Sequence, residues 1–146
     1  MNTFARIASP ASAATDKSGE STRGLVEAAG RVLLSGLFLL SGLGKIGAYA
    51  TTLGYMSAVG LPAALLPLVI GTEVLGAIAL ILGWKTRIAA LLLAGFSVLT
   101  ALVFHRNLGD QIQMIMFLKN LSIAGGLLVL AANGPGRLSI DRRFAP

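Results

Sequence analysis

The chain contains no cysteine and only one histidine, His105. Without thiols it cannot form a disulfide, relay electrons through cysteines or ligate an iron–sulfur cluster by itself. A single histidine also excludes haem ligation by two histidines of the same chain. Redox chemistry would therefore require a bound molecule or a partner subunit.

Charged residues are scarce. They make up 12% of the 146 residues, and hydrophobic residues make up 55%. A soluble domain averages about 25% charged residues. So little charge leaves too little polar surface for a soluble globule, so we expect a single domain whose solvent is the lipid bilayer.

The net charge of +6 could suggest a nucleic-acid partner. However, the basic residues flank apolar blocks and form neither a Lys/Arg run nor a surface interleaved with aromatic residues. Cationic flanks beside apolar blocks are typical of membrane topology. We therefore expect no nucleic-acid binding.

Four apolar blocks are each long enough to cross the hydrocarbon layer as a helix, which takes about 17 to 25 residues. They do not alternate apolar with polar residues as barrel strands would. The sequence therefore predicts an all-α integral membrane four-helix bundle over residues 25–144, preceded by a flexible cytoplasmic tail at 1–24 that is rich in Ser, Ala and Thr. The predicted helices span residues 28–48, 61–83, 88–104 and 112–132.

Lys and Arg residues concentrate in the tail, in the turn between the second and third blocks, and in the C-terminal segment. The positive-inside rule then predicts a multi-pass protein with both termini in the cytoplasm. The first block also ends in Ala48-Tyr49-Ala50, which resembles a signal-peptide cleavage site. Because a long tail precedes this block and Lys45 lies just before the site, we expect the block to be retained.

Two ionisable residues lie deep in the apolar blocks, where each costs about 2.5 to 3.5 kcal/mol on insertion scales. Glu73 is near the middle of the second block, and Lys119 lies in the fourth beside Asn120. At about 1.5 Å per residue their predicted depths differ by about one helical turn. The sequence therefore predicts a direct or water-bridged Glu73–Lys119 pair.

Other polar residues are predicted in the same, outer half of the membrane: Lys45, His105, Arg106 and Asp110. Together with the deep residues they predict a polar pocket that could receive an anion, a quinone head group or a proton. A structural alternative is that the deep pair only fixes helix register while the others meet lipid headgroups. No metal-ligand spacing is present. At the inner end, Arg31 is expected to snorkel to the headgroups.

Over about residues 28–144 the chain resembles the DoxX family of small four-helix membrane proteins. The resemblance rests on Arg31, Ser41-Gly-Leu-Gly-Lys45, Glu73 within GTEVLGAIALILGWKTR, Phe104-His105, Asp110, Phe117-Leu-Lys-Asn-Leu121 and Gly134-Pro-Gly-Arg-Leu-Ser-Ile-Asp141. It implies a cell inner-membrane protein. The family takes its name from a terminal quinol oxidase, and its relatives include a thiosulfate:quinone oxidoreductase subunit and members linked to membrane oxidoreductase complexes.

We therefore expect a quinone-interacting or accessory subunit of a membrane oxidoreductase complex, with a quinone as the possible cofactor and redox subunits as partners. The expected catalytic residues are Glu73 as the deep acid, with His105 and Asp110 as the proton entrance. The expected substrate-binding residues are Lys45, Arg106, Lys119 and Asn120. Two alternatives stay open: a small-solute or anion transporter, which would need to form a homo-oligomer, and a non-catalytic membrane scaffold.

Overall fold

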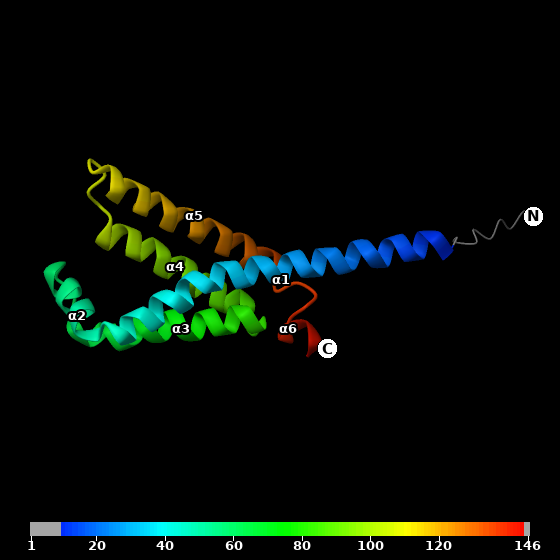
Figure 1. Cartoon of the computed structure of the whole chain (residues 1–146), viewed down its shortest axis with the longest axis horizontal. Helices are drawn as coiled ribbons and strands as arrows, with labels where there is room; N and C mark the ends of the chain where they lie inside the picture. The colour runs from blue at the N-terminus through cyan, green and yellow to red at the C-terminus, as the bar shows by residue number, and fades with distance from the viewer. Residues whose placement is uncertain (1–9, 145–146) are drawn as a thin grey trace, which may run out of the picture.

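The computed structural model describes residues 10–144, and their side chains from residue 19 onward. These residues form helices joined by short turns, with no strand among them (Figure 1). In chain order the elements are α1 (Pro10–Gly47), α2 (Tyr49–Ala58), the short 3₁₀ turn η1 (Ala63–Leu65), α3 (Leu66–Leu82), α4 (Thr86–Phe104), α5 (Gln111–Asn133) and α6 (Ile140–Arg143).

Four helical segments are long and apolar enough to cross a membrane: Gly19–Gly47, Ala63–Leu82, Thr86–Phe104 and Gln111–Asn133. They coincide with the four blocks predicted from the sequence, so the all-α, four-span architecture is confirmed. The cytoplasmic location of both termini stays a prediction, since it depends on the distribution of Lys and Arg alone.

The first helix is longer than the sequence predicted. α1 begins at Pro10, whereas the sequence predicted a start near residue 28. Proline is well tolerated in the first turn of a helix, and no other proline follows until Pro62. Residues 10–24, expected as a flexible tail, therefore continue α1, and an ion pair of 2.8 Å joins Glu20 to Arg137. Residues 1–9 of the expected tail lie outside the described residues.

The spanning helices pack as two antiparallel pairs, α1 with α3 and α4 with α5, and the pairs meet mainly through α3 and α4. Figure 1 shows α2 and the turn between α4 and α5 at one end of the bundle, which we call the α2 end. The short helix α6 and the turn between α3 and α4 lie at the opposite end, which we call the α6 end.

The distribution of side-chain size is inverted relative to a soluble protein. Small residues fill much of the interior, and Ala77, Ala90 and Ala101 have no exposed surface. Large aliphatic residues point outward, with Leu33 78% and Leu40 74% exposed. Lipid tails are as apolar as the side chains, so helices in a membrane associate by close packing and not by the hydrophobic effect. Small residues allow the helix backbones to approach closely. The outward leucines are therefore the lipid-facing surface.

Gly42 sets the distance between α1 and α3. A Cβ atom at this position would lie 2.7 Å from Val74 Cγ2 and 3.2 Å from Glu73 Cβ. Valine is short and branched, so it has little freedom to move away. Gly44, two residues further along the same helix, has nothing within 4 Å of the corresponding point. Of these two glycines, only Gly42 is therefore required for the close approach.

Replacing Gly42→Ala should lower the free energy of unfolding by about 1 to 3 kcal/mol, because the added methyl group overpacks the contact with α3. The matched change Gly44→Ala should cost nothing and could add about 0.5 to 1 kcal/mol, since alanine favours a helix over glycine. Denaturant unfolding in mild detergent measures both. Equal losses at the two positions would contradict the close approach.

Candidate functional site

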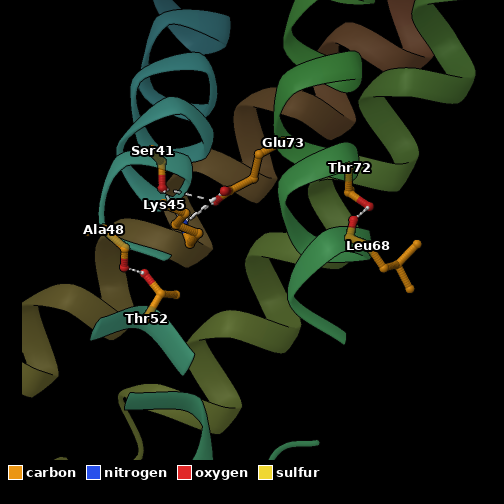
Figure 2. A network of polar contacts seen from close by, with 7 residues as sticks. All are labelled: Ser41, Lys45, Ala48, Thr52, Leu68, Thr72 and Glu73. Atoms are coloured by element: carbon orange, nitrogen blue, oxygen red, sulfur yellow. Dashed lines mark hydrogen bonds and ion pairs between the residues drawn. The ribbon is translucent and has the colours of Figure 1, made fainter. Parts of the chain in front are cut away.

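A buried carboxylate, an ammonium and a hydroxyl meet between α1 and α3 (Figure 2). Glu73 on α3 is only 3% exposed. Its Oε1 and Oε2 accept hydrogen bonds from Lys45 Nζ at 2.9 and 2.8 Å. Lys45 Nζ also donates to Ser41 Oγ at 2.6 Å, and Ser41 Oγ donates to Glu73 Oε1 at 3.0 Å. The three groups form a closed triangle, which we call the Glu73 triad.

The geometry of α1 explains why two of these groups share one face. Ser41 and Lys45 are four residues apart, which places them one above the other on a helix. The side of α1 that faces the bundle carries residues 31, 35, 38 and 42, spaced by four and three, and all four are buried. Lys45 continues this stripe by three more residues. The sequence thus brings the cation to the interface with α3.

The triad meets the condition under which charge is tolerated away from water. Removing two charges from water costs several kcal/mol per ion, which is offset only by good geometry and further hydrogen bonds. Lys45 has three N–H donors, and the three acceptor atoms Glu73 Oε1, Glu73 Oε2 and Ser41 Oγ use them all. The side chain of Lys45 is 25% exposed, against 4% for Glu73. A molecule in the membrane would therefore contact Lys45 before it contacts Glu73.

The direct Glu73–Lys119 ion pair predicted from the sequence is not formed. Lys119 is exposed on α5, and within the part of the chain that the structure describes no ion pair joins it to Glu73. The depth of a residue along the membrane, on which that prediction rested, does not say which helices are neighbours. Because α3 packs on α1 and α4 rather than on α5, the partner of Glu73 comes from α1. Lys45, expected at the outer rim, takes that place.

The remaining predicted site residues lie near the α2 end or along α5 and make no hydrogen bond or ion pair with the triad. His105 Nδ1 lies 2.9 Å from Gln113 Oε1, and Asp110 accepts a hydrogen bond from the Gln113 backbone N–H as the cap of α5. Asn120 donates to the Met116 carbonyl of its own helix at 3.0 Å, and Arg106 is exposed. Among the side chains of residues 19–144, no group of three His, Asp or Glu residues could hold a metal ion.

A second polar cluster, at the α6 end, was missed by the sequence analysis. The expectation that Arg31 snorkels to lipid headgroups is wrong, because its side chain lies inside and the residue is 2% exposed. It donates through Nη2 to the Leu138 carbonyl. Its Nε and Nη1 are buried without a hydrogen-bond partner among the described residues. The i, i+4 and i+3 spacing of the α1 stripe is the sequence signal that could have placed Arg31 inside.

Asp141 of α6 joins α6 to the turn between α3 and α4. Its carboxylate accepts the backbone N–H groups of Lys85 at 2.7 Å and Thr86 at 2.8 Å, and its own N–H donates to the Gly83 carbonyl at 2.8 Å. Burial alone would raise the pKa of Asp141, but these backbone hydrogen bonds and the charge of Arg31 outweigh it and lower the pKa. At pH values above the ordinary pKa of an aspartate, the ionised carboxylate therefore holds α6 against the start of α4. That contribution is lost as the pH falls through the lowered value.

Removing one charged partner of the Glu73 triad should destabilise the fold. Lys45→Met should lower the free energy of unfolding by about 3 to 5 kcal/mol, because it leaves Glu73 buried without a counter-charge. The double change Lys45→Met with Glu73→Gln should recover much of that loss, since no unpaired charge then remains. A double-mutant cycle of detergent-micelle unfolding measures the coupling. If the double variant lost as much free energy of unfolding as the two single variants together, the two side chains would not be coupled.

The comparisons with known proteins agree with this architecture. The DoxX family matches residues 27–106, which include Arg31 and the Glu73 triad. The chain is 50% identical over 112 residues to the inner membrane protein YqjF of Escherichia coli (strain K12), covering 77% of this chain and 86% of that protein. It is 41% identical over 99 residues to the inner membrane protein YphA of the same strain, covering 63% and 71%.

No solved structure matches the chain. The family match covers more than half of the residues, and both relatives are matched over more than two thirds of their length. With four spanning helices, this is a multi-pass inner-membrane protein in contact with the lipid bilayer. The chain belongs to the DoxX family.

Proposed function

We propose that the chain is a quinone-interacting accessory subunit of a membrane oxidoreductase complex and that the Glu73 triad is its working site. The observation that carries the proposal is the Lys45–Glu73 pair, a buried carboxylate held in a membrane-spanning bundle by a lysine that is partly exposed. Ionisable groups within spanning helices are a functional hypothesis by default, because they are costly to insert.

The chemistry of the triad suits a quinone head group. Quinone carbonyl oxygens accept hydrogen bonds, and a bound quinone would replace Ser41 Oγ as the third acceptor of Lys45 Nζ, which is the most accessible donor of the triad. Glu73, in direct contact with that nitrogen, would take up or release the proton that accompanies electron transfer to or from the bound quinone. The electrons would come from a partner subunit, because the chain has no cysteine and only one histidine.

The other residues suggested by the sequence have unequal support. His105 and Asp110 flank the turn between α4 and α5, at the end of the bundle toward which Lys45 lies, so they remain the proposed proton entrance. Arg106, Lys119 and Asn120 lie apart from the hydrogen bonds and the ion pair that build the triad. The proposal therefore does not depend on those three side chains.

Gentle purification from native membranes tests the proposal. The wild-type chain should retain a stoichiometric amount of quinone and co-purify with redox subunits. Lys45→Met should lose most of the quinone because its hydrogen-bond donor is gone. Glu73→Gln should keep an acceptor for Lys45 but abolish quinone-linked electron transfer by the purified complex.

Thr72→Val is the matched control, because the Thr72 hydroxyl donates to the Leu68 carbonyl of its own helix and takes no part in the triad. This variant should keep both quinone and activity. A wild-type chain without quinone, or full electron transfer by Glu73→Gln, would contradict the proposal. Loss of stability without separable loss of activity would instead indicate a scaffold. Solute flux in proteoliposomes lacking redox partners would indicate a transporter.

A further inference from the structure

The α6 end carries a basic hollow of about 780 Å³ that the proposed function does not use. We call it the α6 bowl. Its basic lining residues are Arg23, Lys85, Arg87, Arg137 and Arg142. It lies where α4 begins at Thr86 and α5 ends at Asn133, so it is at the ends of two of the helices that are long and apolar enough to cross the membrane. Its position at the ends of these helices and its excess of cations favour an anionic ligand.

The acidic residues of the α6 bowl do not neutralise all of these cations. Each carboxylate already has a partner: Glu20 pairs with Arg137 at 2.8 Å, Glu27 pairs with Arg23 at 3.0 Å, and Asp141 accepts the backbone N–H groups of Lys85 and Thr86. Among the described residues, the side chains of Lys85, Arg87 and Arg142 make no ion pair. These three cations are thus not neutralised by a carboxylate, and Lys85 Nζ lies 5.5 Å from the centroid of the Trp84 ring.

A second, smaller hollow of about 230 Å³ adjoins the bowl between α1 and α5, and we call it the α1–α5 groove. It shares Arg23, Glu27 and Asn133 with the bowl. Its other lining is mainly apolar and includes Val26, Leu34, Val129 and Leu130. α1 and α5 touch each other little, so this groove runs from the polar end of the bundle toward its lipid-facing surface.

Arg31 adds a buried positive charge next to the α1–α5 groove. It lines the α1–α5 groove and is 2% exposed, yet its Nε and Nη1 have no hydrogen-bond partner within the described part of the chain. The guanidinium points to the α6 side, because Nη1 lies where a Cβ atom on Gly83 would collide with it and Nη2 donates to the Leu138 carbonyl. It would therefore act on a ligand in the groove through its charge and not through a direct hydrogen bond. Glu27 and Asp141 act on Arg31 through their charges, but neither forms an ion pair with it in the described residues.

We propose that the α6 bowl and the α1–α5 groove together bind one anionic phospholipid, with its phosphate among the basic residues and an acyl chain along the groove. Guanidinium groups suit phosphate oxygens because they offer several N–H donors in a fixed plane. The guanidinium of Arg87 is placed for this, as it lies against Gly134, where a Cβ atom would come 3.4 Å from its Nε and Nη2. The joined polar and apolar hollows match an amphiphile better than a free ion.

Native mass spectrometry of the purified full chain tests the proposal with two probes that carry the same acyl chains, dioleoylphosphatidylglycerol and dioleoylphosphatidylcholine. The anionic lipid should bind at least about tenfold more tightly, since each basic residue near a membrane surface adds about fivefold. The double change Arg87→Gln with Arg142→Gln should remove that preference. Arg143→Gln, a loss of one charge on the same short helix as Arg142 but outside the bowl lining, should retain it.

The groove is tested separately. Gly30 lines it and has nothing within 4 Å of the point that a Cβ atom would occupy, so Gly30→Leu should fill the groove and weaken binding of the anionic lipid several-fold. Gly36→Leu on the same helix, also in open space but outside the groove, should not. Equal binding of the two lipids would overturn the proposal, as would unchanged binding by Gly30→Leu. Full displacement of the anionic lipid by millimolar inorganic phosphate would assign the site to a free phosphate instead.

Discussion

The ion pair between Lys45 and Glu73 fixes how α1 lies on α3, and the rest of the bundle depends on that placement. Sliding α1 by one turn would leave both charges unpaired in the membrane, each costing about 2.5 to 3.5 kcal/mol on insertion scales. Gly42 lies beside the pair and lets the two helix backbones come close enough for the contact. The pair and the glycine therefore act together, one setting the register and the other the distance.

The buried stripe of α1 carries a cation near each end. Lys45 meets a carboxylate on a neighbouring spanning helix, and Arg31 meets a backbone carbonyl of the segment that leads to α6. Within the described residues the first cation is fully paired, and the second is not. We assign the two ends different roles: an internal acid–base pair toward the α2 end, and an anion-binding surface at the α6 end, where Lys85, Arg87 and Arg142 make no ion pair among the described residues.

Much of the fold could be predicted because the hydrocarbon layer imposes a length and a composition on each span, and the four apolar blocks satisfy both. The rotational position of each helix could not be predicted so directly. Depth along the membrane suggested Lys119 as the partner of Glu73, but depth does not say that α5 packs on α4. Arg31 was misplaced for a related reason: its position near a helix end permits snorkelling, and only the stripe that it shares with Ser35 and Phe38 indicates burial. The polar cluster at the α6 end depends on the hydrogen bonds between Asp141 and the start of α4. No local sequence pattern predicts this long-range contact.

The distance between the Lys45 ammonium and the Glu73 carboxylate, measured by solid-state NMR of the labelled chain in lipid bilayers, tests the central claim most directly. Few lysines are present, and Lys119→Arg removes the competing signal from the fourth span. The account predicts a strong ¹⁵N–¹³C coupling consistent with direct contact, as in the 2.8 Å separation of Nζ and Oε2, and its survival in Lys119→Arg. A coupling that disappears with Lys119→Arg, or no coupling between any lysine and Glu73, would contradict it.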